Sequence, residues 1–565
     1  MAKTVGIGLQ DFEKIRKRNV FYIDKTKFIQ EWWESQDDVT LITRPRRFGK
    51  TLTMRMLEQF FSVEYQGRGD LFESLYIWEK EEYRSLQGTY PVIFLSFADI
   101  KETTFPETKK KICKIIQLLY RRFDFLLEGN LLSESEKREF QRVGPEMEDY
   151  AAALSVQQLS NYLCRYYGKK VLVLLDEYDT PIQESYVNGF WEELSSFIRN
   201  FFNATFKGNQ YLERAVMTGI TRVSKESIFS DLNNLEVVTT TSRKYEDCFG
   251  FTEDEVFAAL EEYGFSEKKE DVKEWYDGFV FGEKPDIYNP WSIINYLDKG
   301  RLEAYWANTS SNSLIGKLIR EGSRNIKLSF EALLGGETLK TRVDEQIVYS
   351  QLDQDENALW SLLLACGYLK VKSVELADRS KQAENPVYEL EFTNYEVRLM
   401  FRNMVRGWFG VTQSDYNDFI QALLQGNLDA MNEYMNRVAE NTFSYFDTGN
   451  RPSKKQEPER FYHGFVLGLM VDLTDQYTIL SNRESGFGRY DVILEPKKEG
   501  LDAVILEFKV FQPHREKTLE DTVREVLGQI EKKKYDCVLK ERGIPDTRIR
   551  KYGFAFCGKE VLIGV

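Results

Sequence analysis

The stretch at 41–51, LITRPRRFGKT, holds residue types that could grip a phosphate chain. Gly49, Lys50 and Thr51 would supply a backbone turn, an ammonium for the outer phosphates and a hydroxyl for magnesium. Arg44 stands five positions before Gly49, where the usual motif has a glycine, and Pro45 fixes one dihedral angle. A lone Gly-Lys-Thr could be a basic surface turn. Here an apolar run precedes it and a helical pattern follows, and this context predicts a nucleotide site.

A second group of candidate residues follows the aliphatic run of VLVLLDEYDTP. Asp176 and Glu177 would emerge from a buried strand, where the pair can hold a magnesium shell and polarise an attacking water. The alternative is a solvated loop start, which the phosphate loop upstream makes the weaker explanation. A further run, RAVMTG, ends at Thr218 and is followed by Thr221 and Arg222. These residues either sense the γ-phosphate or form an ordinary polar cluster, and the pattern favours neither.

The C-terminal region carries a different chemistry, in ESGFGRYDVILEP and AVILEFKV. Asp491 lies in one expected strand, while Glu507 and Lys509 lie two residues apart on the next and therefore share a face. Two carboxylates can bind magnesium, and a lysine beside them can orient or activate water for attack on a phosphodiester. The aliphatic setting gives weight to this triplet, because an unpaired buried charge is costly. Less specific additions are Glu459, Glu484, Gln529 and Tyr535, each of which could equally be a solvated surface residue.

The elements that would position these residues begin with an alternation of apolar runs and amphipathic stretches, which predicts a parallel sheet covered by helices. The expected strands are 39–43, 91–97, 171–175 and 214–218, and the expected helices include 52–61 and 108–127. From about Glu253 the pattern is largely helical, with two turn-rich segments, WYDGFVFG and IYNPWS. A helix and two strands around the polar gap 377–385 then suggest a winged helix.

A Gly-, Pro- and charge-rich stretch at 448–459 predicts a domain boundary. After it we expect, in order, a helix at 460–473, strands at 477–481, 490–495 and 503–509, a helix at 519–539 and a strand at 553–557. The fold class is therefore multidomain α/β. Its expected parts are a P-loop domain at 1–285, a helical and winged-helix-like middle at 286–447 and a nuclease-like α/β domain at 448–565.

Length and composition bound the possible functions. The chain has 565 residues, of which 42% are apolar and 14% aromatic, so it can bury several cores. Six cysteines without a paired spacing and two histidines argue against a disulfide framework or a zinc site. The first residues lack the apolar core of a signal peptide and no run is long enough for a membrane span, which predicts a cytoplasmic protein. A net charge of −14 argues against nonspecific coating of nucleic acid but not against a local basic groove.

Several unusual segments occur in one order, and together they resemble the predicted AAA-ATPase-like family of bacterial proteins. They are FYIDKTKFI, LITRPRRFGKT, LVLLDEYDTPI, TGITRVSKESIFSDLNN, EWYDGFVFG and IYNPWSIINYL. ESGFGRYDVILEP, ILEFKV and QIEKKKY resemble a PD-(D/E)XK nuclease domain. Tyr490 stands where the proline that names the superfamily would be. The RPRRFGKT form is typical of the first family, so the loop with Arg44 resembles a variant of the motif that this family carries.

The resemblance implies that ATP and Mg²⁺ are the cofactors. It assigns nucleotide binding to Gly49, Lys50 and Thr51, magnesium binding and hydrolysis to Asp176 and Glu177, and nuclease metal chemistry to Asp491, Glu507 and Lys509. We also expect Arg47, Phe48, Asp176, Thr218 and Arg222 to lie in the nucleotide-binding site. The metal ligands would be Thr51 and Asp176 at one site and Asp491 and Glu507 at the other.

We therefore expect an ATPase coupled to magnesium-dependent cleavage of nucleic acid, DNA or RNA, with no membrane partner and with a homo-oligomer left open. The main alternative is an ATP-switched binding or signalling protein whose nuclease-like domain binds nucleic acid or a partner without cutting. A transcriptional regulator that uses the winged helix would leave the C-terminal carboxylates and lysine unexplained.

Overall fold

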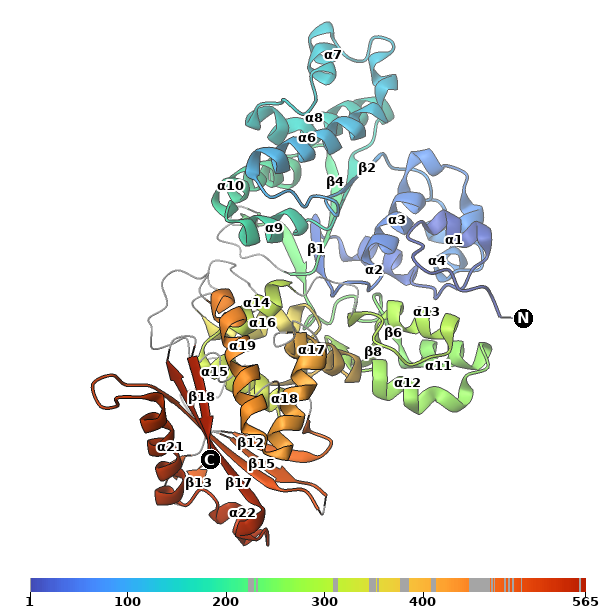
Figure 1. Ribbon diagram of the computed structural model, residues 1–565. Helices are drawn as coiled ribbons and strands as arrows, with labels where there is room; N and C mark the ends of the chain where they lie inside the picture. The colour runs from blue at the N-terminus through green and yellow to red at the C-terminus, as the bar shows by residue number, and fades with distance from the viewer. Residues whose placement is uncertain are drawn as a thin grey trace, which may run out of the picture. The chain divides into compact units, whose positions relative to one another are not determined.

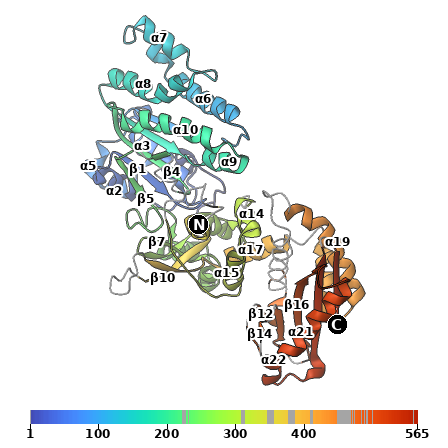
Figure 2. The same cartoon turned by 90° about the vertical axis from the view of Figure 1, so that its left-hand side faces the viewer.

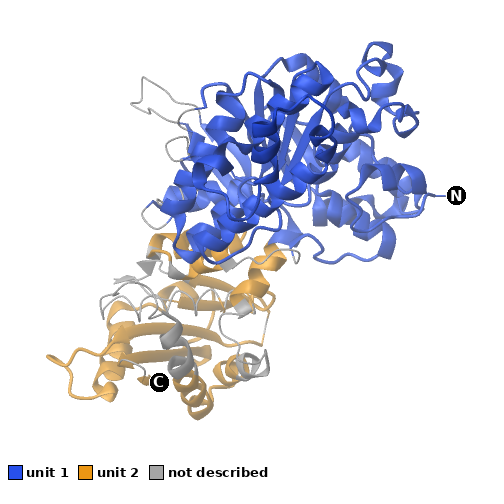
Figure 3. Ribbon diagram, turned by 90° about the horizontal axis from the view of Figure 1, so that it is seen from above, with its two compact units in different colours: residues 1–311, 340–397 blue, residues 312–339, 398–565 orange. Residues whose placement is uncertain are grey.

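A computed structural model describes most of the chain. The described residues are 2–221, 228–229, 232–307, 313–344, 352, 355–375, 386–407, 413–446, 468, 471, 473–481, 484–485, 488–489, 492–498, 500–557 and 560–565. They form two compact units, one of residues 1–311 with 340–397 and one of residues 312–339 with 398–565 (Figure 3). No helix among the described residues is both long enough and apolar enough to cross a membrane.

The first unit is built on a five-stranded parallel sheet in the order β2-β3-β4-β1-β5. Its strands are β1 (Val39–Thr43), β2 (Val92–Ser96), β3 (Val171–Asp176), β4 (Leu212–Gly219) and β5 (Leu235–Val238). Every residue of β1 and β3 is buried, as expected for strands with helices on both faces. The four predicted strands are confirmed within two residues, while β5 was missed because only four residues pair there.

Helices cover both faces of this sheet (Figure 1). On one side lie α1 (Phe12–Arg18), α2 (Lys27–Ser35), α3 (Lys50–Phe61) and α4 (Tyr76–Glu79), and on the other lie α6 (Phe105–Arg121), α8 (Asp149–Tyr167) and α10 (Trp191–Phe202). Three shorter helices complete this part: α5 (Glu81–Arg84), α7 (Glu134–Gln141) and α9 (Thr180–Asn188). Trp32, Phe60 and Phe61 pack with sheet residues such as Phe94 and Leu172 in one buried core. The predicted helix at 108–127 ends at Arg121 and is followed by a short 3₁₀ turn.

The segment after β5 is less helical than the sequence predicts. Besides α11 (Glu253–Glu262), α12 (Lys269–Tyr276) and α13 (Pro290–Lys299), it contains a small antiparallel sheet of β6 (Phe251–Thr252), β8 (Lys284–Tyr288) and β7 (Phe279–Phe281). The turn-rich WYDGFVFG therefore contributes a strand. Gly282, with φ 58, makes this turn, and a Cβ there would meet the backbone of Arg243 at 2.7 Å.

The helix and hairpin expected in the middle of the chain are present. They are α16 (Glu356–Ala365), β10 (Leu369–Glu375) and β11 (Val387–Phe392), with β9 (Leu339–Thr341) on the other side of β11. The hairpin tip at 376–385 lies outside the described residues, as does the predicted linker at 448–459. The helix α17 (Tyr395–Gly407) begins directly after β11. The boundaries predicted for a three-part division remain predictions.

The second unit contains a mixed sheet in the order β12-β15-β16-β17-β18. Its strands are β12 (Tyr477–Ser481), β15 (Val492–Pro496), β16 (Ala503–Val510), β17 (Ile549–Cys557) and β18 (Glu560–Gly564), and the short pair β13 (Glu484–Ser485) and β14 (Gly488–Arg489) forms a separate hairpin. Its helices are α14 (Ser313–Glu321), α15 (Arg324–Leu334), α18 (Gln413–Gln425), α19 (Leu428–Phe446), α21 (Leu519–Lys533) and α22 (Cys537–Glu541). The helix α21 packs on β16 and β17 (Figure 2).

Two details of this unit depart from the sequence prediction. The single helix expected at 519–539 is broken, because Lys534 adopts a left-handed φ of 52 and caps α21. The edge strand β18 was missed. Its backbone is covered by α19, since the side-chain amides of Asn432 and Asn436 each exchange two hydrogen bonds with it, at 2.7–3.1 Å. Such cover removes an exposed sheet edge.

Candidate nucleotide and metal sites

The phosphate loop joins β1 to α3 at the carboxyl end of the parallel sheet. Gly49 caps α3 with a left-handed φ of 83, and the space around its Cα is open, so backbone conformation alone calls for glycine there. Lys50 is 5% exposed, and its ammonium donates to the carbonyls of Arg44 and Pro45, each at 2.8 Å. Burial lowers the pKa of Lys50, and three nearby carboxylates oppose that shift. The loop thus holds a cation at its centre, beside the free N–H groups of a helix start.

Arg44 points away from the loop into the protein interior. Its guanidinium is fully buried and donates to the carbonyls of Thr43 at 2.9 Å, Thr239 at 2.6 Å and Tyr245 at 3.3 Å, and it lies 4.6 Å from the Phe281 ring centre. Burial lowers its pKa to about 10. The side chain therefore ties the loop to the segment after β5, and the missing glycine does not block the loop.

The two residues before Gly49 behave differently from each other. Arg47 takes a left-handed φ of 65, and its guanidinium lies 4.5 Å from the ring centre of Trp291. Phe48 is 1% exposed and packs against Phe279 and Phe281. The Phe48 side chain therefore packs into the protein interior and holds the loop there. Only the backbone of Phe48 can face a ligand.

Asp176 is the centre of a hydrogen-bonded group at the ends of β1, β3 and β4. Its carboxylate is fully buried and accepts from Thr51 Oγ1 at 2.8 Å and from Thr218 Oγ1 at 2.6 Å. The register explains the meeting, because β4 lies between β1 and β3 and pairs with both strands. Burial raises the pKa of Asp176, while the two hydroxyl donors favour its charged form. Two predicted residues, Thr51 and Thr218, far apart in sequence, thus meet at the carboxylate of a third, Asp176.

Glu177 follows with a left-handed φ of 52, a rare conformation for a residue with a side chain. Its N–H donates to Thr218 Oγ1 at 3.3 Å, and its carboxylate accepts from Thr180 Oγ1 at 3.2 Å. Strain of this kind concentrates at functional sites. The turn directs Glu177 separately from Asp176, so the two acids have distinct surroundings.

Asp179 is a residue of this site that the sequence analysis missed. Its buried carboxylate accepts from the N–H groups of Ile220 and Thr221, at 2.8 and 2.9 Å, and from Thr221 Oγ1 at 3.1 Å. It therefore fixes the chain that leaves β4 toward Arg222, which lies outside the described residues. The quoted motif LLDEYDTP contains this third acid, and its spacing from the strand end was the available signal.

The C-terminal candidate site centres on β16 and α21. Glu507 is 5% exposed, and its carboxylate accepts from Gln529 Nε2 at 2.6 Å, which also reaches Tyr535 Oη at 3.2 Å. Gln529 thus lies at the predicted carboxylate, while Tyr535 follows the end of α21. The strand β15 begins at Val492, which pairs with Leu506. Asp491 and Glu459 lie outside the described residues, and of Glu484 only its place in β13 is described.

Lys509 takes part in two ion pairs that the sequence did not predict. Its ammonium lies 2.6 Å from Glu516 Oε1 and 2.5 Å from Glu525 Oε2. Partial burial would lower the pKa of Lys509, but the two carboxylates raise it. Glu516 also accepts from the Gln512 N–H and from Thr522 Oγ1, each at 2.8 Å. Burial would raise the pKa of Glu516, but the ammonium of Lys509 and these two donors hold it at about 2. Lys509 is consequently a charged ammonium in this arrangement.

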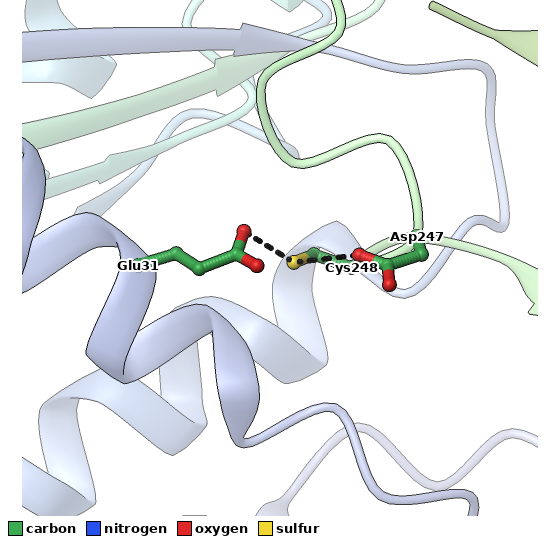
Figure 4. A group of neighbouring side chains, drawn as sticks. All are labelled: Glu31, Asp247 and Cys248. Carbon is green, nitrogen blue, oxygen red and sulfur yellow. Dashed lines mark hydrogen bonds between the residues drawn. The ribbon is translucent and has the colours of Figure 1, made fainter. Parts of the chain in front are cut away.

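A carboxylate and thiol cluster in the first unit contains none of the predicted site residues. Figure 4 shows the Cys248 thiol between the carboxylates of Glu31 and Asp247, to which it donates at 3.3 and 3.7 Å. Burial raises the pKa of the Cys248 thiol well above its usual value, so the sulfur keeps its proton. The ammonium of Lys27 lies 2.9 Å from Glu31 and 3.1 Å from Asp247. An internal cation thus already balances the two acids.

Comparisons with known proteins find two domain families in the chain. Residues 6–229 match the family model described as predicted AAA-ATPase, and residues 457–565 match the PD-(D/E)XK nuclease superfamily. The chain thus combines an AAA-ATPase-like domain with a PD-(D/E)XK nuclease superfamily domain. A protein from Azotobacter chroococcum mcd 1, named as the uncharacterized protein in the vnfD 5′ region, is 26% identical over 399 residues. That match covers 70% of this chain and 68% of the relative.

Proposed function

We propose that the first unit binds and hydrolyses ATP with magnesium, and that the C-terminal domain cleaves phosphodiester bonds of nucleic acid with a divalent metal. The observation that carries the first part is the convergence of Thr51, Asp176 and Thr218 beside the cation of Lys50. A hydroxyl and a carboxylate within 2.8 Å of each other form the oxygen-rich group that magnesium prefers. The two family matches support the pairing of these activities in one chain.

Each residue of the nucleotide site has a proposed task. The N–H groups at the start of α3 and the ammonium of Lys50 would hold the phosphates, and Thr51 with Asp176 would hold the metal. Bound magnesium would neutralise the charge that develops on the transferred phosphoryl group. Glu177 would orient the attacking water. Thr218 holds the Asp176 carboxylate and the Glu177 N–H in place through its hydroxyl. The donor set therefore fits magnesium-bound ATP.

At the C-terminal site the proposed roles of the residues differ from those at the nucleotide site. Glu507, oriented by Gln529, would bind the metal together with Asp491. Because Lys509 is charged, it would act by attracting the phosphodiester or the incoming hydroxide, and not by removing a proton. Nucleic acid is the proposed partner of this domain.

One observation favours the alternative of a domain that binds nucleic acid without cutting it. Lys509 is already paired with two glutamates, and a substrate phosphate would have to compete with both. Cleavage would then depend on an exchange of ion-pair partners, which ATP binding in the first unit could promote. Coupling between the units is part of the proposal.

Phosphate release from ATP tests the first part. The wild-type protein should release phosphate only with magnesium, and Asp176→Asn should lose the activity because the amide cannot replace the anionic ligand. Asp70→Asn is a matched control, since the side chain of Asp70 is 56% exposed and pairs with Arg68. Equal turnover in Asp176→Asn and the control would remove Asp176 from the site.

A panel of single- and double-stranded DNA and RNA, with magnesium and with or without ATP, tests the second part. Cleavage by the wild type that disappears in Glu507→Gln supports the nuclease. Glu531→Gln is the control, because Glu531 is an exposed acid on the same helix as Gln529. Binding without cleavage of any substrate, in every nucleotide state, would instead support the alternative.

A further inference from the structure

The backbone of the phosphate loop is held from outside the sheet domain by two side chains. The carbonyl of Arg46 accepts from Asn289 Nδ2 at 3.2 Å and from Trp306 Nε1 at 3.0 Å. The next residue, Arg47, has the left-handed φ of 65. A backbone in such a conformation persists only where its surroundings fix it, and these two donors supply part of that restraint.

Both donors are themselves rigidly placed. Asn289 is 1% exposed and caps α13 with its side-chain oxygen, which accepts from the N–H groups of Trp291 and Ser292 at 2.9 and 3.4 Å. Trp306 is 3% exposed, with its ring centre 5.4 Å from that of Phe279 and 5.5 Å from that of Tyr368. Contacts outside the loop thus hold both side chains in place.

A single buried carboxylate connects the two donors. Glu396, in the first turn of α17, accepts from Ser292 Oγ at 2.8 Å and from the N–H groups of Trp306 at 2.5 Å and Ala307 at 3.2 Å. It is 1% exposed, and all three of these donors are neutral. A buried acid costs free energy unless hydrogen bonds satisfy it, so its position is strongly specified by these partners.

We propose that Asn289, Trp306 and Glu396 are positioning residues for the phosphate loop. They fix the Arg46 carbonyl and so aim the N–H groups of the following residues at the nucleotide phosphates. The three residues lie outside the ranges that the two family models match. The proposal rests on the proposed binding of ATP.

The same contacts give the loop a route to α17. If bound phosphates move the Arg46 carbonyl, the hydrogen bonds to Asn289 and Trp306 change, and with them the surroundings of Glu396. Nucleotide can act at a distance only by favouring one conformation over another. ATP should therefore alter the protection of the first turn of α17 from hydrogen exchange.

Four variants of the whole chain separate positioning from general stability. Trp306→Phe keeps a ring and removes the indole N–H, and Asn289→Asp keeps the helix cap but removes the amide donor. Glu396→Gln keeps an acceptor for the two backbone N–H groups and serves as the conservative variant of Glu396→Leu. Trp360→Phe is the matched control, because Trp360 is also 3% exposed but belongs to α16.

ATP affinity, the unfolding midpoint and hydrogen exchange of 395–401 are measured for each protein. Loss of one hydrogen bond should weaken ATP binding about 3- to 10-fold in Trp306→Phe and in Asn289→Asp. Glu396→Gln should stay within about twofold of wild type because its amide oxygen can still accept hydrogen bonds, and Glu396→Leu should weaken binding more. The ATP-induced exchange difference in α17 should disappear in Trp306→Phe and persist in Trp360→Phe, even where both midpoints fall alike.

The outcomes distinguish the positioning role from the proposed ATP binding on which it rests. Wild-type protein that does not bind ATP would overturn the proposed function, and the positioning role with it. Wild-type protein that binds ATP while Trp306→Phe and Asn289→Asp bind equally well would overturn the positioning role alone.

Discussion

The two candidate sites differ in how far their side chains are already arranged. At the nucleotide site, Thr51 and Thr218 both donate to Asp176, and Lys50 lies within the loop where phosphates would bind. At the C-terminal site, Gln529 orients Glu507, but the ammonium of Lys509 is held by Glu516 and Glu525. In the proposed nucleotide site the carboxylate and hydroxyls are already in contact, whereas in the proposed nuclease site Lys509 would have to exchange ion-pair partners before it could meet a phosphate.

Lys50→Ala should have the largest effect, because it removes the only cation that the loop carbonyls of Arg44 and Pro45 hold in the described structure. We expect ATP affinity to fall by at least about 100-fold, as for loss of a well-placed donor to an anion in a water-poor site. Nucleotide titration measures this effect. Lys14→Ala is the control, since its side chain is 60% exposed. Unchanged affinity in a folded Lys50→Ala protein would contradict the prearranged site.

Glu177→Gln should separate binding from turnover. The amide can still accept from Thr180, so the loop and the affinity for ATP should be kept. Hydrolysis should fall about 100-fold or more if Glu177 orients or activates the water. Bound nucleotide and released phosphate are measured on the same samples. Full turnover would assign that task to another group.

Lys509→Ala and Glu516→Gln should have opposite effects at the C-terminal site. Removing the lysine should abolish most cleavage, and raised magnesium should not rescue it, because the metal ligands are untouched. Glu516→Gln removes one of the two competing carboxylates and should lower the KM for nucleic acid several-fold, as expected for one hydrogen-bonded ion pair. Cleavage rates across substrate concentrations provide the measurement. A raised KM in Glu516→Gln would show that the ion pair positions Lys509 instead of withholding it.

Two acids of the first unit, Glu396 and Asp277, predict a pH dependence of stability. Burial raises the pKa of Glu396 to about 7, and burial together with neighbouring Asp286 raises the pKa of Asp277 to about 7. Both groups bind a proton more tightly in the folded chain than in the unfolded chain. Their contribution to stability is therefore complete below the unfolded pKa values and is lost as pH rises toward 7.

Denaturant unfolding at pH 5, 6, 7 and 8 checks this smaller effect. The wild type should lose stability relative to the double variant Asp277→Asn and Glu396→Gln as pH rises over this range. Asp70→Asn should track the wild type, because Asp70 is a surface residue. Parallel pH profiles for the wild type and the double variant would contradict the two raised pKa values.

The sequence predicted those structural features that depend on residues close together in the chain. The phosphate loop, the strand before it and the acids after β3 are contiguous patterns, and β1 matches its predicted bounds. The supports of the loop could not be predicted in this way, because Asn289 and Trp306 lie 243 and 260 residues from Arg46. Their pairing depends on how the small β6-β8-β7 sheet and α13 pack.

The C-terminal domain shows the same limit. An aliphatic strand with Glu507 and Lys509 on one face was predicted, and β16 has that pattern. The partners of Lys509 were not, because Glu516 and Glu525 belong to the turn and helix that follow the strand, where acids usually face water. The break after α21 was also missed, since nothing in the charged run around Lys534 marks its left-handed φ of 52.

The magnesium dependence of ATP binding by a pair of Thr51 variants tests the central claim most directly. Thr51→Ser keeps the hydroxyl that lies 2.8 Å from Asp176, and Thr51→Val replaces it with a methyl group of similar size. The account predicts that magnesium tightens ATP binding in the wild type and in Thr51→Ser but not in Thr51→Val. If magnesium strengthens ATP binding by the same factor in Thr51→Val as in the wild type, the assignment of Thr51 and Asp176 as the metal site is contradicted.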